Sequence, residues 1–373
     1  MKRMKFPLIK PYLVRKDIQE VTKVLDSGWL TQGKFVEKVE KSLKKDNRVK
    51  FAFLLNSATS GLIAGIKALG LERKDEIIIP SFTFPATANS VILGGAKPVF
   101  CDIDLETFNL SPEKITALIT PQTKAIMPVH EFGLSADMGK IMKIARQHDL
   151  FVIEDAACSL GAGYKGKRTG ILGDLGVFSF HPRKIVTSGE GGCLITNSSE
   201  IAKKIGCLRN HGEYNRKFIT YGYNFRMSDI QAAVLYPQLM RINIIVKKRI
   251  SLALNYNKFL KPLEDKSILK TPVCPQGYKH VYQSYVILLS EKIDRDKLKK
   301  FLRAKGVETQ FGTHCVPLTD FYKKYFDIPK NSYKNSRYAY EHTLALPLYH
   351  TLKMKEQEII VRELEKSIKK CAR

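Results

Sequence analysis

The sequence lacks the cysteine spacing that a zinc site or a disulfide framework would need. Its seven cysteines are an odd number, and no two of them form a C-x-x-C pair. Zinc ligands usually come in closely spaced pairs, and structural disulfides belong to oxidising compartments. We therefore expect a protein without a metal site that works in a reducing compartment.

Long apolar runs are also missing. No stretch of about 18 apolar residues occurs, which is the length that a membrane-spanning helix requires. The basic start of the chain is interrupted by Pro7, Lys10 and Pro11, and no small-residue cleavage site follows it. These features predict a cytoplasmic protein without a membrane span.

Acidic residues are scarce relative to basic ones, with 36 Asp and Glu against 62 Lys and Arg and a net charge of +26. Such a charge attracts anionic partners. The densest basic runs, residues 297–305 and 366–373, place their cations at helical spacing among apolar residues, as on an exposed helix face. Because no zinc-finger or single-strand-binding signature accompanies them, we expect a small anionic substrate and no nucleic acid.

Short apolar runs alternate with amphipathic stretches between residue 50 and residue 200. Several runs are apolar on both faces, which is typical of strands buried within a helix-covered sheet. This order predicts an α/β fold with a mostly parallel central sheet flanked by helices. The expected strands are residues 51–56, 76–80, 97–104, 124–130, 150–155, 177–180 and 192–197.

The character of the sequence changes near residue 250. Residues 228–262 read as a long helix with a break near Pro237. Beyond it we expect a mixture of strand and helix, so residues 1–250 should form a large domain that includes the N-terminal segment, and residues 251–373 a smaller α+β domain. The expected elements of the small domain are a strand at 284–289 and helices at 294–304 and 355–370.

Two segments follow strands at the edge of the sheet where ligands usually bind. "NSATSGL" (56–62) opens a helix, and its free backbone N–H groups with Ser57 and Thr59 would hold a phosphate or simply cap the helix. Asp155 ends a buried strand, where a carboxylate either caps the next turn or pairs with a cofactor cation. The residues themselves leave both alternatives open.

The segment "FSFHPRKIVTSGEGG" (178–192) places Lys184 between an aromatic strand and a glycine cluster. The strand alternation puts Ser179 on the face opposite its two phenylalanines. A lysine desolvated beside Arg183 and His181 loses proton affinity and becomes a nucleophile, whereas a solvated lysine is a surface cation.

A fourth segment, "YGYNFRMSDIQAA" (221–233), has Asn224 and Arg226 just before a helix. An amide and a guanidinium in this place would bind a phosphate or a carboxylate. The alternative is a capping turn with an arginine at the surface.

The order and spacing of these segments resemble the DegT/DnrJ/EryC1/StrS family of sugar aminotransferases, pyridoxal phosphate enzymes of fold type I, the aspartate aminotransferase-like fold. The resemblance covers nearly the whole chain. It is carried by "DSGWLTQG" (26–33), "NSATSGL", "IIIPSFTFPATANSVILGGAKPVFCDID" (77–104), "VIEDAACSLGAGYKGKRTG" (152–170), "FSFHPRKIVTSGEGG", "RNHG" (209–212), "YGYNFRMSDIQAA" and "LALPLY" (344–349).

This resemblance implies pyridoxal 5'-phosphate as the cofactor, with Lys184 as its Schiff-base lysine and Asp155 as the partner of its ring nitrogen. Phe84 would stack on the ring, and a homodimer would share its active sites. The implied phosphate ligands are Ser57, Ala58, Thr59, Ser179 and, from a second subunit, Asn224.

The chain departs from many relatives at Cys158, where they have glutamine or histidine near the phenolic oxygen of the cofactor. Related sugar dehydratases have histidine in place of the lysine, so Lys184 favours transamination. The implied reaction moves an amino group, with glutamate as the implied donor, to the keto group of a nucleotide-diphosphate-linked deoxy sugar for surface polysaccharide or glycoconjugate synthesis. His314 and Arg226 are the candidate substrate residues.

Two other functions stay open at this point. A pyridoxal-dependent lyase or dehydratase would use the same fold, and the basic charge alone would fit a non-enzymatic binding or regulatory protein.

Overall fold

A computed structural model of the chain describes residues 4–329 and 331–371. Its centre is a seven-stranded sheet with the strand order β1-β10-β9-β6-β5-β2-β4. Only β10 within this sheet runs antiparallel to its neighbours, so the predicted mostly parallel sheet is confirmed. The strands are β1 (Phe51–Leu55), β2 (Glu76–Pro80), β4 (Lys97–Cys101), β5 (Thr123–Ile126), β6 (Phe151–Asp155), β9 (Leu175–Ser179) and β10 (Gly192–Thr196).

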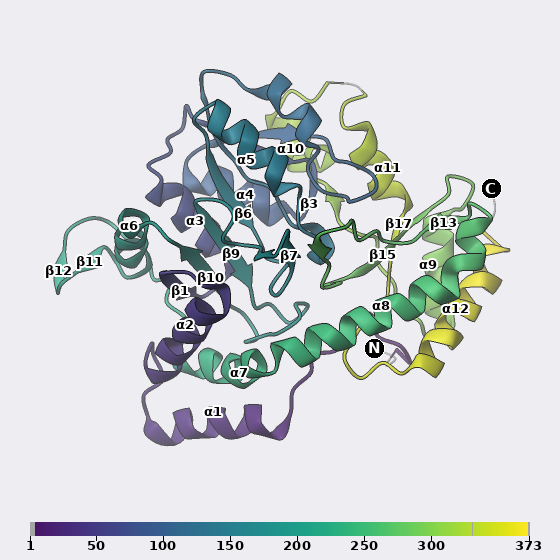
Figure 1. Cartoon of the computed structure of the whole chain (residues 1–373), viewed down its shortest axis with the longest axis horizontal. Helices are drawn as coiled ribbons and strands as arrows, with labels where there is room; N and C mark the ends of the chain where they lie inside the picture. Colours follow the sequence, from purple (N-terminus) through teal and green to yellow (C-terminus); the bar gives the residue numbers. More distant parts are fainter. Residues whose placement is uncertain (1–3, 330, 372–373) are drawn as a thin grey trace.

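Helices cover both faces of this sheet, which explains why its strands are apolar throughout (Figure 1). In β2, for example, Ile78 packs with Ile141 of α5, whereas Ile79 on the other face packs with Ile66 of α3. One face is covered by α2 (Lys34–Asn47), α5 (Met138–Gln147) and α7 (Asp229–Met240), and the other by α3 (Ala58–Ala68), α4 (Pro85–Gly94) and α6 (Ser199–Arg209).

A second core forms around a three-stranded antiparallel sheet in the C-terminal part. The long helix α8 leads from the first core into the second (Figure 1), and Ile250 on α8 packs against both. The division of the chain at residue 250 stays a prediction, and Phe6 of the N-terminal segment packs in the second core. The elements are α8 (Ile242–Asp265), β13 (Leu269–Lys270), β15 (Tyr285–Leu289), α9 (Arg295–Ala304), β17 (Thr343–Leu346) and α12 (Met354–Ile368).

The expected helix break near Pro237 was misplaced. Pro237 lies buried inside α7, and the chain turns at Arg241, between α7 and α8. The Arg241 guanidinium binds the buried Asp17 carboxylate at 2.6 Å and thereby fixes the turn. Packing of α7 between α1 and α2 outweighs the backbone hydrogen bond that the proline removes.

Short elements join the two cores and decorate the surface. β3 pairs with β16, and β7 pairs with β8 and β14, so both of these small sheets link the first core to later segments. No helix in the part of the chain that the structure describes is long and apolar enough to cross a membrane. The short elements are α1 (Arg15–Ser27), β3 (Phe82–Thr83), β7 (Gly163–Tyr164), β8 (Lys167–Arg168), β11 (Glu213–Tyr214), β12 (Lys217–Phe218), β14 (Tyr278–Lys279), β16 (His314–Cys315), α10 (Asp320–Tyr325) and α11 (Lys334–His342), with 3-10 turns at 112–114, 116–118, 131–133 and 316–318.

Candidate active site

The carboxyl ends of β1, β6 and β9 meet at one edge of the central sheet, because these three strands run in the same direction. A cavity of about 480 Å³ opens at this edge. Its lining includes Asp155 and Lys184, which the sequence predicted as catalytic residues. Six further residues that were predicted to bind the cofactor also line it: Ser57, Ala58, Thr59, Phe84, Cys158 and Ser179.

 In all, eight of the nine residues that the sequence predicted to bind the cofactor, Asp155 and Lys184 included, line the cavity from one chain, and Asn224 is the ninth.

The N-terminus of α3 forms one end of this cavity, with Ser57, Ala58 and Thr59 in its lining. The Ser57 hydroxyl accepts a hydrogen bond from the backbone N–H of Ser60 at 3.0 Å, so Ser57 caps the helix. The first N–H groups of a helix have no partner within the helix and attract an anion. Capping and phosphate binding are therefore compatible here, rather than alternatives.

Gly192 at the start of β10 lies directly against this helix end. A Cβ atom at residue 192 would sit 2.5 Å from the backbone nitrogen of Ala58 and equally close to the backbone of Ser57. Any side chain would push β10 and α3 apart, since both contacts are backbone atoms. Glycine at this position lets the strand and the helix end enclose the phosphate end of the cavity, with Ser179 on the neighbouring strand β9.

Lys184 is half-buried, and its Nζ lies 3.1 Å from the Cys158 Sγ. Burial lowers the pKa of the Lys184 amine, but Cys158, Asp155 and Glu131 raise it by more, so its pKa lies above the ordinary value. The expectation that the pKa of Lys184 is lowered beside Arg183 and His181 is therefore wrong. Arg183 is exposed to solvent, and the amine faces acidic groups instead.

Asp155 is only 4% exposed, at the end of β6. Its carboxylate accepts hydrogen bonds from the Thr87 hydroxyl at 2.8 Å and from the backbone N–H of Ala157 at 3.2 Å. Burial raises the pKa of the Asp155 carboxyl, although both donors and Lys184 lower it in part. A buried carboxylate whose ionisation is disfavoured in this way would be stabilised by a cation placed beside it.

The donor set of the cavity fits pyridoxal phosphate, the cofactor that the resemblance implies. The helix end at Ala58 suits the phosphate, the buried carboxylate of Asp155 suits a protonated ring nitrogen, and the Lys184 amine suits the aldehyde. Phe84, which caps the start of α4 and is 64% exposed, offers an aromatic face at the same cavity. Cys158 lies beside Lys184, where many relatives have a longer polar side chain.

His314 is not among the residues that line the cavity, but it lies beside two of them. Its ring centroid is 6.3 Å from that of Phe84 and 4.9 Å from that of Phe311, and both phenylalanines line the cavity. Burial lowers the pKa of His314, so the ring favours its neutral form. A substrate entering past Phe84 would meet this histidine.

Asn224 and Arg226 lie elsewhere in the same chain. The backbone carbonyl of Asn224 accepts a hydrogen bond from the Asn56 amide at 3.3 Å, and the Arg226 guanidinium donates to the side chain of Asn210. Neither residue belongs to the lining of the cavity. The structure of one chain thus separates these two candidates from Lys184.

Two residues of the cavity were not predicted. Thr87, in the first turn of α4, binds Asp155, and Glu131 follows β5 as a second buried carboxyl group. Glu131 stands just beyond a buried parallel strand, as Asp155 stands at the end of the next one. The same rule that singled out Asp155 could therefore have found Glu131.

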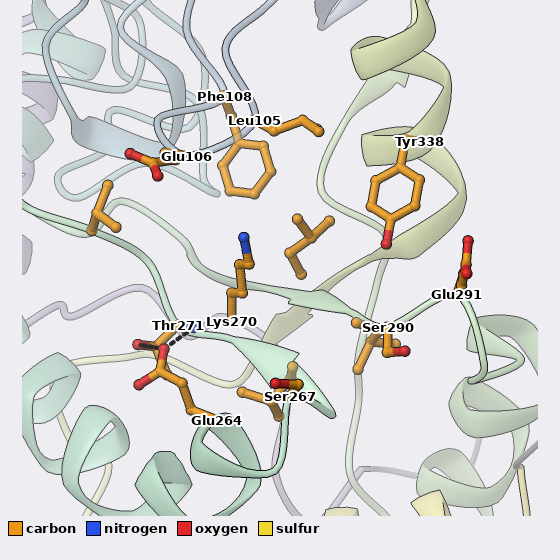
Figure 2. A pocket seen from close by; sticks show the side chains of 14 residues that line it. Leu105, Glu106, Phe108, Glu264, Ser267, Lys270, Thr271, Ser290, Glu291 and Tyr338 are labelled. Carbon is orange, nitrogen blue, oxygen red and sulfur yellow. Dashed lines mark hydrogen bonds between the residues drawn. The ribbon is translucent and has the colours of Figure 1, made fainter.

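A second cavity, of about 610 Å³, lies between the loop at 105–108 and the C-terminal sheet (Figure 2). Lys270 points into it from β13, while Glu264 at its floor accepts a hydrogen bond from the Thr271 hydroxyl at 2.8 Å. Lys270 is exposed to solvent, and so is Glu106 on the opposite wall. In the first cavity, by contrast, the buried carboxyl group of Asp155 lies in the same lining as the half-buried Lys184 amine. The first cavity is therefore the candidate active site.

Comparison with known proteins agrees with this geometry. Residues 11–365 match the family described as the DegT/DnrJ/EryC1/StrS aminotransferase family. GDP-perosamine synthase of Caulobacter vibrioides is 41% identical over 306 residues, which cover 80% of this chain and 82% of that protein.

Solved structures show the same similarity. PseC of Helicobacter pylori, an aminotransferase involved in the biosynthesis of pseudoaminic acid, is 29% identical with a TM-score of 0.91, over 98% of this chain and 99% of that one. DesV of S. venezuelae, solved in complex with a ketimine intermediate, is 28% identical with a TM-score of 0.91 over 98% of each chain. The chain thus belongs to the DegT/DnrJ/EryC1/StrS family and is a pyridoxal phosphate-dependent sugar aminotransferase of fold type I.

Proposed function

We propose that the enzyme transfers an amino group from L-glutamate to the keto group of a nucleotide-diphosphate-linked deoxy sugar. The observation that carries this proposal is the cavity that contains Lys184 and Asp155, in a chain that is 41% identical to a GDP-perosamine synthase. The product would be an amino sugar for surface polysaccharide or glycoconjugate synthesis.

The roles of the site residues follow from their positions. Pyridoxal phosphate, when bound, supplies an electron sink for the electron pair left at a substrate carbon. The Lys184 amine removes the proton from the α-carbon of the donor and later returns a proton to the carbon that bore the keto group. Asp155 would hold a proton on the ring nitrogen, since its buried carboxylate is stabilised by a cation placed beside it.

An arginine and a histidine at the cavity support an anionic substrate. His181 and the exposed Arg183 line the cavity on the segment that carries Lys184. Guanidinium groups bind diphosphates well, because several N–H donors face the oxygens of the anion. His314, beside Phe84, would contact the sugar, and Arg226 would act at a site that a second subunit completes.

Transfer of labelled nitrogen tests the proposed reaction. The purified protein is incubated with pyridoxal phosphate, heavy-nitrogen glutamate and a panel of nucleotide-linked keto sugars, and the products are weighed by mass spectrometry. We expect one sugar to exchange its ketone for a labelled amine. Loss of water from the sugar without incorporation of the label would instead show a dehydratase, and an unchanged panel would contradict the proposal.

We further propose that the enzyme is a homodimer with shared active sites. Large apolar side chains are exposed on α1 and just after it, among them Ile18, Leu25 and Trp29. Others are exposed on the segment that follows β11, namely Phe218 and Tyr221. Exposed apolar groups at this density favour an interface. In such a dimer Asn224 of one subunit would reach the phosphate end of the other subunit's cavity.

Mixed dimers test the shared site. Lys184→Ala and Asn224→Ala chains, each inactive alone, should regain about a quarter of wild-type activity when unfolded, mixed in equal amounts and refolded, because half of the dimers then hold one intact site of two. The Asn224 substitution leaves intact the backbone carbonyl that binds Asn56. Two Lys184→Ala samples mixed in the same way serve as the control. No recovery in the test mixture would place Asn224 in its own chain's site, and full activity of the Asn224→Ala protein alone would place it in neither site.

The cytoplasm remains our expectation for the location of the enzyme. All seven cysteines are free thiols in the structure, and five of them are buried: Cys101, Cys193, Cys207, Cys315 and Cys371. A reducing compartment preserves such thiols.

A further inference from the structure

Two buried glutamines hold the segment that carries Lys184. Between β9 and β10 the chain forms turns and bends, so no helix or strand ladder fixes the backbone around this lysine. Gln238 of α7 exchanges two hydrogen bonds with the backbone of Thr187, at 3.1 and 2.7 Å. The Gln283 Nε2 donates to the carbonyl of Arg183 at 2.8 Å, directly before Lys184. The place of the lysine therefore depends on side chains that are distant in the sequence.

The Gln283 amide has one orientation. The Arg183 carbonyl only accepts hydrogen bonds, so the amide nitrogen has to face it. The Oε1 atom then lies on the other side of the amide, where it is buried and has no hydrogen-bond partner among the residues that the structure describes. Gln283 is 4% exposed and lines the cavity. Within the described chain, the one hydrogen bond of its side chain is thus the bond to the backbone next to Lys184.

The backbone that leads to Gln283 is strained. Tyr282 has a φ of +49°, in the left-handed region that residues with bulky side chains rarely adopt. The Arg249 guanidinium donates to the Tyr282 carbonyl at 2.9 Å and to the Gln283 carbonyl at 2.7 Å. Both bonds come from α8, the helix that leads from the first core into the second. Arg249 thereby fixes the turn from which the Gln283 side chain reaches Arg183.

Arg249 is costly to keep in this place. It is 5% exposed, and it forms no ion pair within the part of the chain that the structure describes. Burial lowers its pKa to about 10, so it stays charged at neutral pH. A buried charge without a counter-ion, a strained tyrosine and an unpaired amide oxygen each lower the stability of the fold. Such features collect where a structure serves a function, and here all three meet at the contact with the Lys184 segment.

We propose that Gln283 is a positioning residue that holds Lys184 in place for the reaction, with Arg249 as its anchor on α8. The connection runs from the Arg249 guanidinium through the Gln283 backbone and amide to the Arg183 carbonyl. Lys184 is tied in this way to the second core, while Gln238 ties it to the first. This role rests on the proposed function of Lys184 as the amine that moves the proton.

Loss of this anchor should slow the reaction rather than weaken substrate binding. Proton transfer needs the amine within reach of the reacting carbon, and a small misplacement of a catalytic group lowers the rate strongly. An interaction that acts only through the placement of Lys184 therefore changes kcat and leaves KM as it is. A direct contact of Gln283 with the substrate would raise KM instead.

Hydrogen exchange of the full-length protein tests whether Gln283 holds the segment. Gln283→Met keeps the length of the side chain and removes the donor. The Lys184 N–H, which donates to the His181 carbonyl at 2.8 Å, should exchange about tenfold faster in this variant, because a hydrogen bond that opposes local opening is lost. Gln357→Met is the matched control, since Gln357 is fully buried, donates to the Leu252 carbonyl at 2.8 Å and lies outside the cavity. The control should leave this exchange rate unchanged, and an unchanged rate in Gln283→Met would overturn the proposal.

Steady-state kinetics test the consequence for the reaction. Gln283→Met should lower kcat about tenfold and keep KM within about twofold of wild type, whereas Gln357→Met should keep both. Thermal unfolding checks that each variant is folded at the assay temperature. Equal losses of kcat in the two variants would show a general effect on the fold, and a raised KM with wild-type kcat would show a contact with the substrate; either result overturns the proposal. If Lys184→Ala kept wild-type turnover, the proposed function of Lys184 would have failed, and the exchange rates would still decide whether Gln283 holds the segment.

Arg249→Met tests the anchor without a change at Gln283. It removes both donors to the turn, so the Lys184 N–H should again exchange faster and kcat should fall. In the double variant with Gln283→Met, the loss of kcat should be little greater than the larger single loss, because both changes break one connection. Losses that multiply in the double variant would show that the two residues act independently, and would overturn the role of Arg249 as the anchor.

Discussion

Replacement of Lys184 by alanine should abolish covalent attachment of pyridoxal phosphate and lower turnover by roughly 100- to 10,000-fold, the range that a lost general base accounts for. The Lys184 Nζ is the amine that lies among Cys158, Asp155 and Glu131 in the cavity, so no neighbouring lysine on the same segment can replace it. Reduction with borohydride followed by peptide mass spectrometry measures the attachment. Transfer of labelled nitrogen measures the turnover.

Lys292→Ala is the matched control for this experiment, because Lys292 is an exposed lysine of the C-terminal part that lies outside the cavity. It should keep both the attachment and the turnover of wild type. Attachment of the cofactor to the Lys184→Ala protein at wild-type yield would show that another amine forms the bond, and would remove Lys184 from the centre of the mechanism.

Asp155→Asn should weaken binding of the cofactor and lower turnover, each by on the order of 30- to 5,000-fold. This range corresponds to the roughly 2–5 kcal/mol lost when one partner of a buried, hydrogen-bonded charge pair is removed. The Thr87 hydroxyl and the Ala157 N–H both donate to this carboxylate. An asparagine offers one acceptor oxygen in place of two and turns its amide N–H₂ group toward the other donor, so one of these two hydrogen bonds is lost together with the charge.

Fluorescence titration with pyridoxal phosphate and steady-state turnover measure these two effects. Asp265→Asn is the control, since Asp265 forms an exposed pair with Lys261, and such pairs contribute about 0–1 kcal/mol. Thermal unfolding separates a local effect from a loss of fold. Cofactor affinity equal to that of wild type in a folded Asp155→Asn protein would contradict the assigned role.

Much of the candidate site could be predicted because parallel strands bring their carboxyl ends to one edge. Asp155, Ser179 and the helix start at Ser57 each follow a strand whose apolar pattern is plain in the sequence. The spacing of motifs along the chain therefore indicated which side chains would meet. The pattern also predicted the strands of the central sheet within a few residues.

Other features depend on contacts that no local pattern contains. Burial lowers the pKa of Lys184, but Cys158, Asp155 and Glu131, which come from other segments, raise it by more, so the adjacent Arg183 was a poor guide to the direction of the shift. Pro237 seemed to end a helix, but packing against α1 and α2 holds α7 together across it. Long-range packing decides both cases, and a reading of neighbouring residues cannot supply it.

The pairing of β1 with β10 determines when the cofactor site can form during folding. Phe51 to Leu55 pair with Gly192 to Thr196, and the α3 helix end that follows β1 packs against Gly192. When the ribosome has made only β1, this strand still lacks its partner. Its later pairing with β10 closes the long segment between the two strands, which costs conformational entropy. Newly made chains therefore become able to retain pyridoxal phosphate only after β10 has emerged, late in the assembly of the sheet.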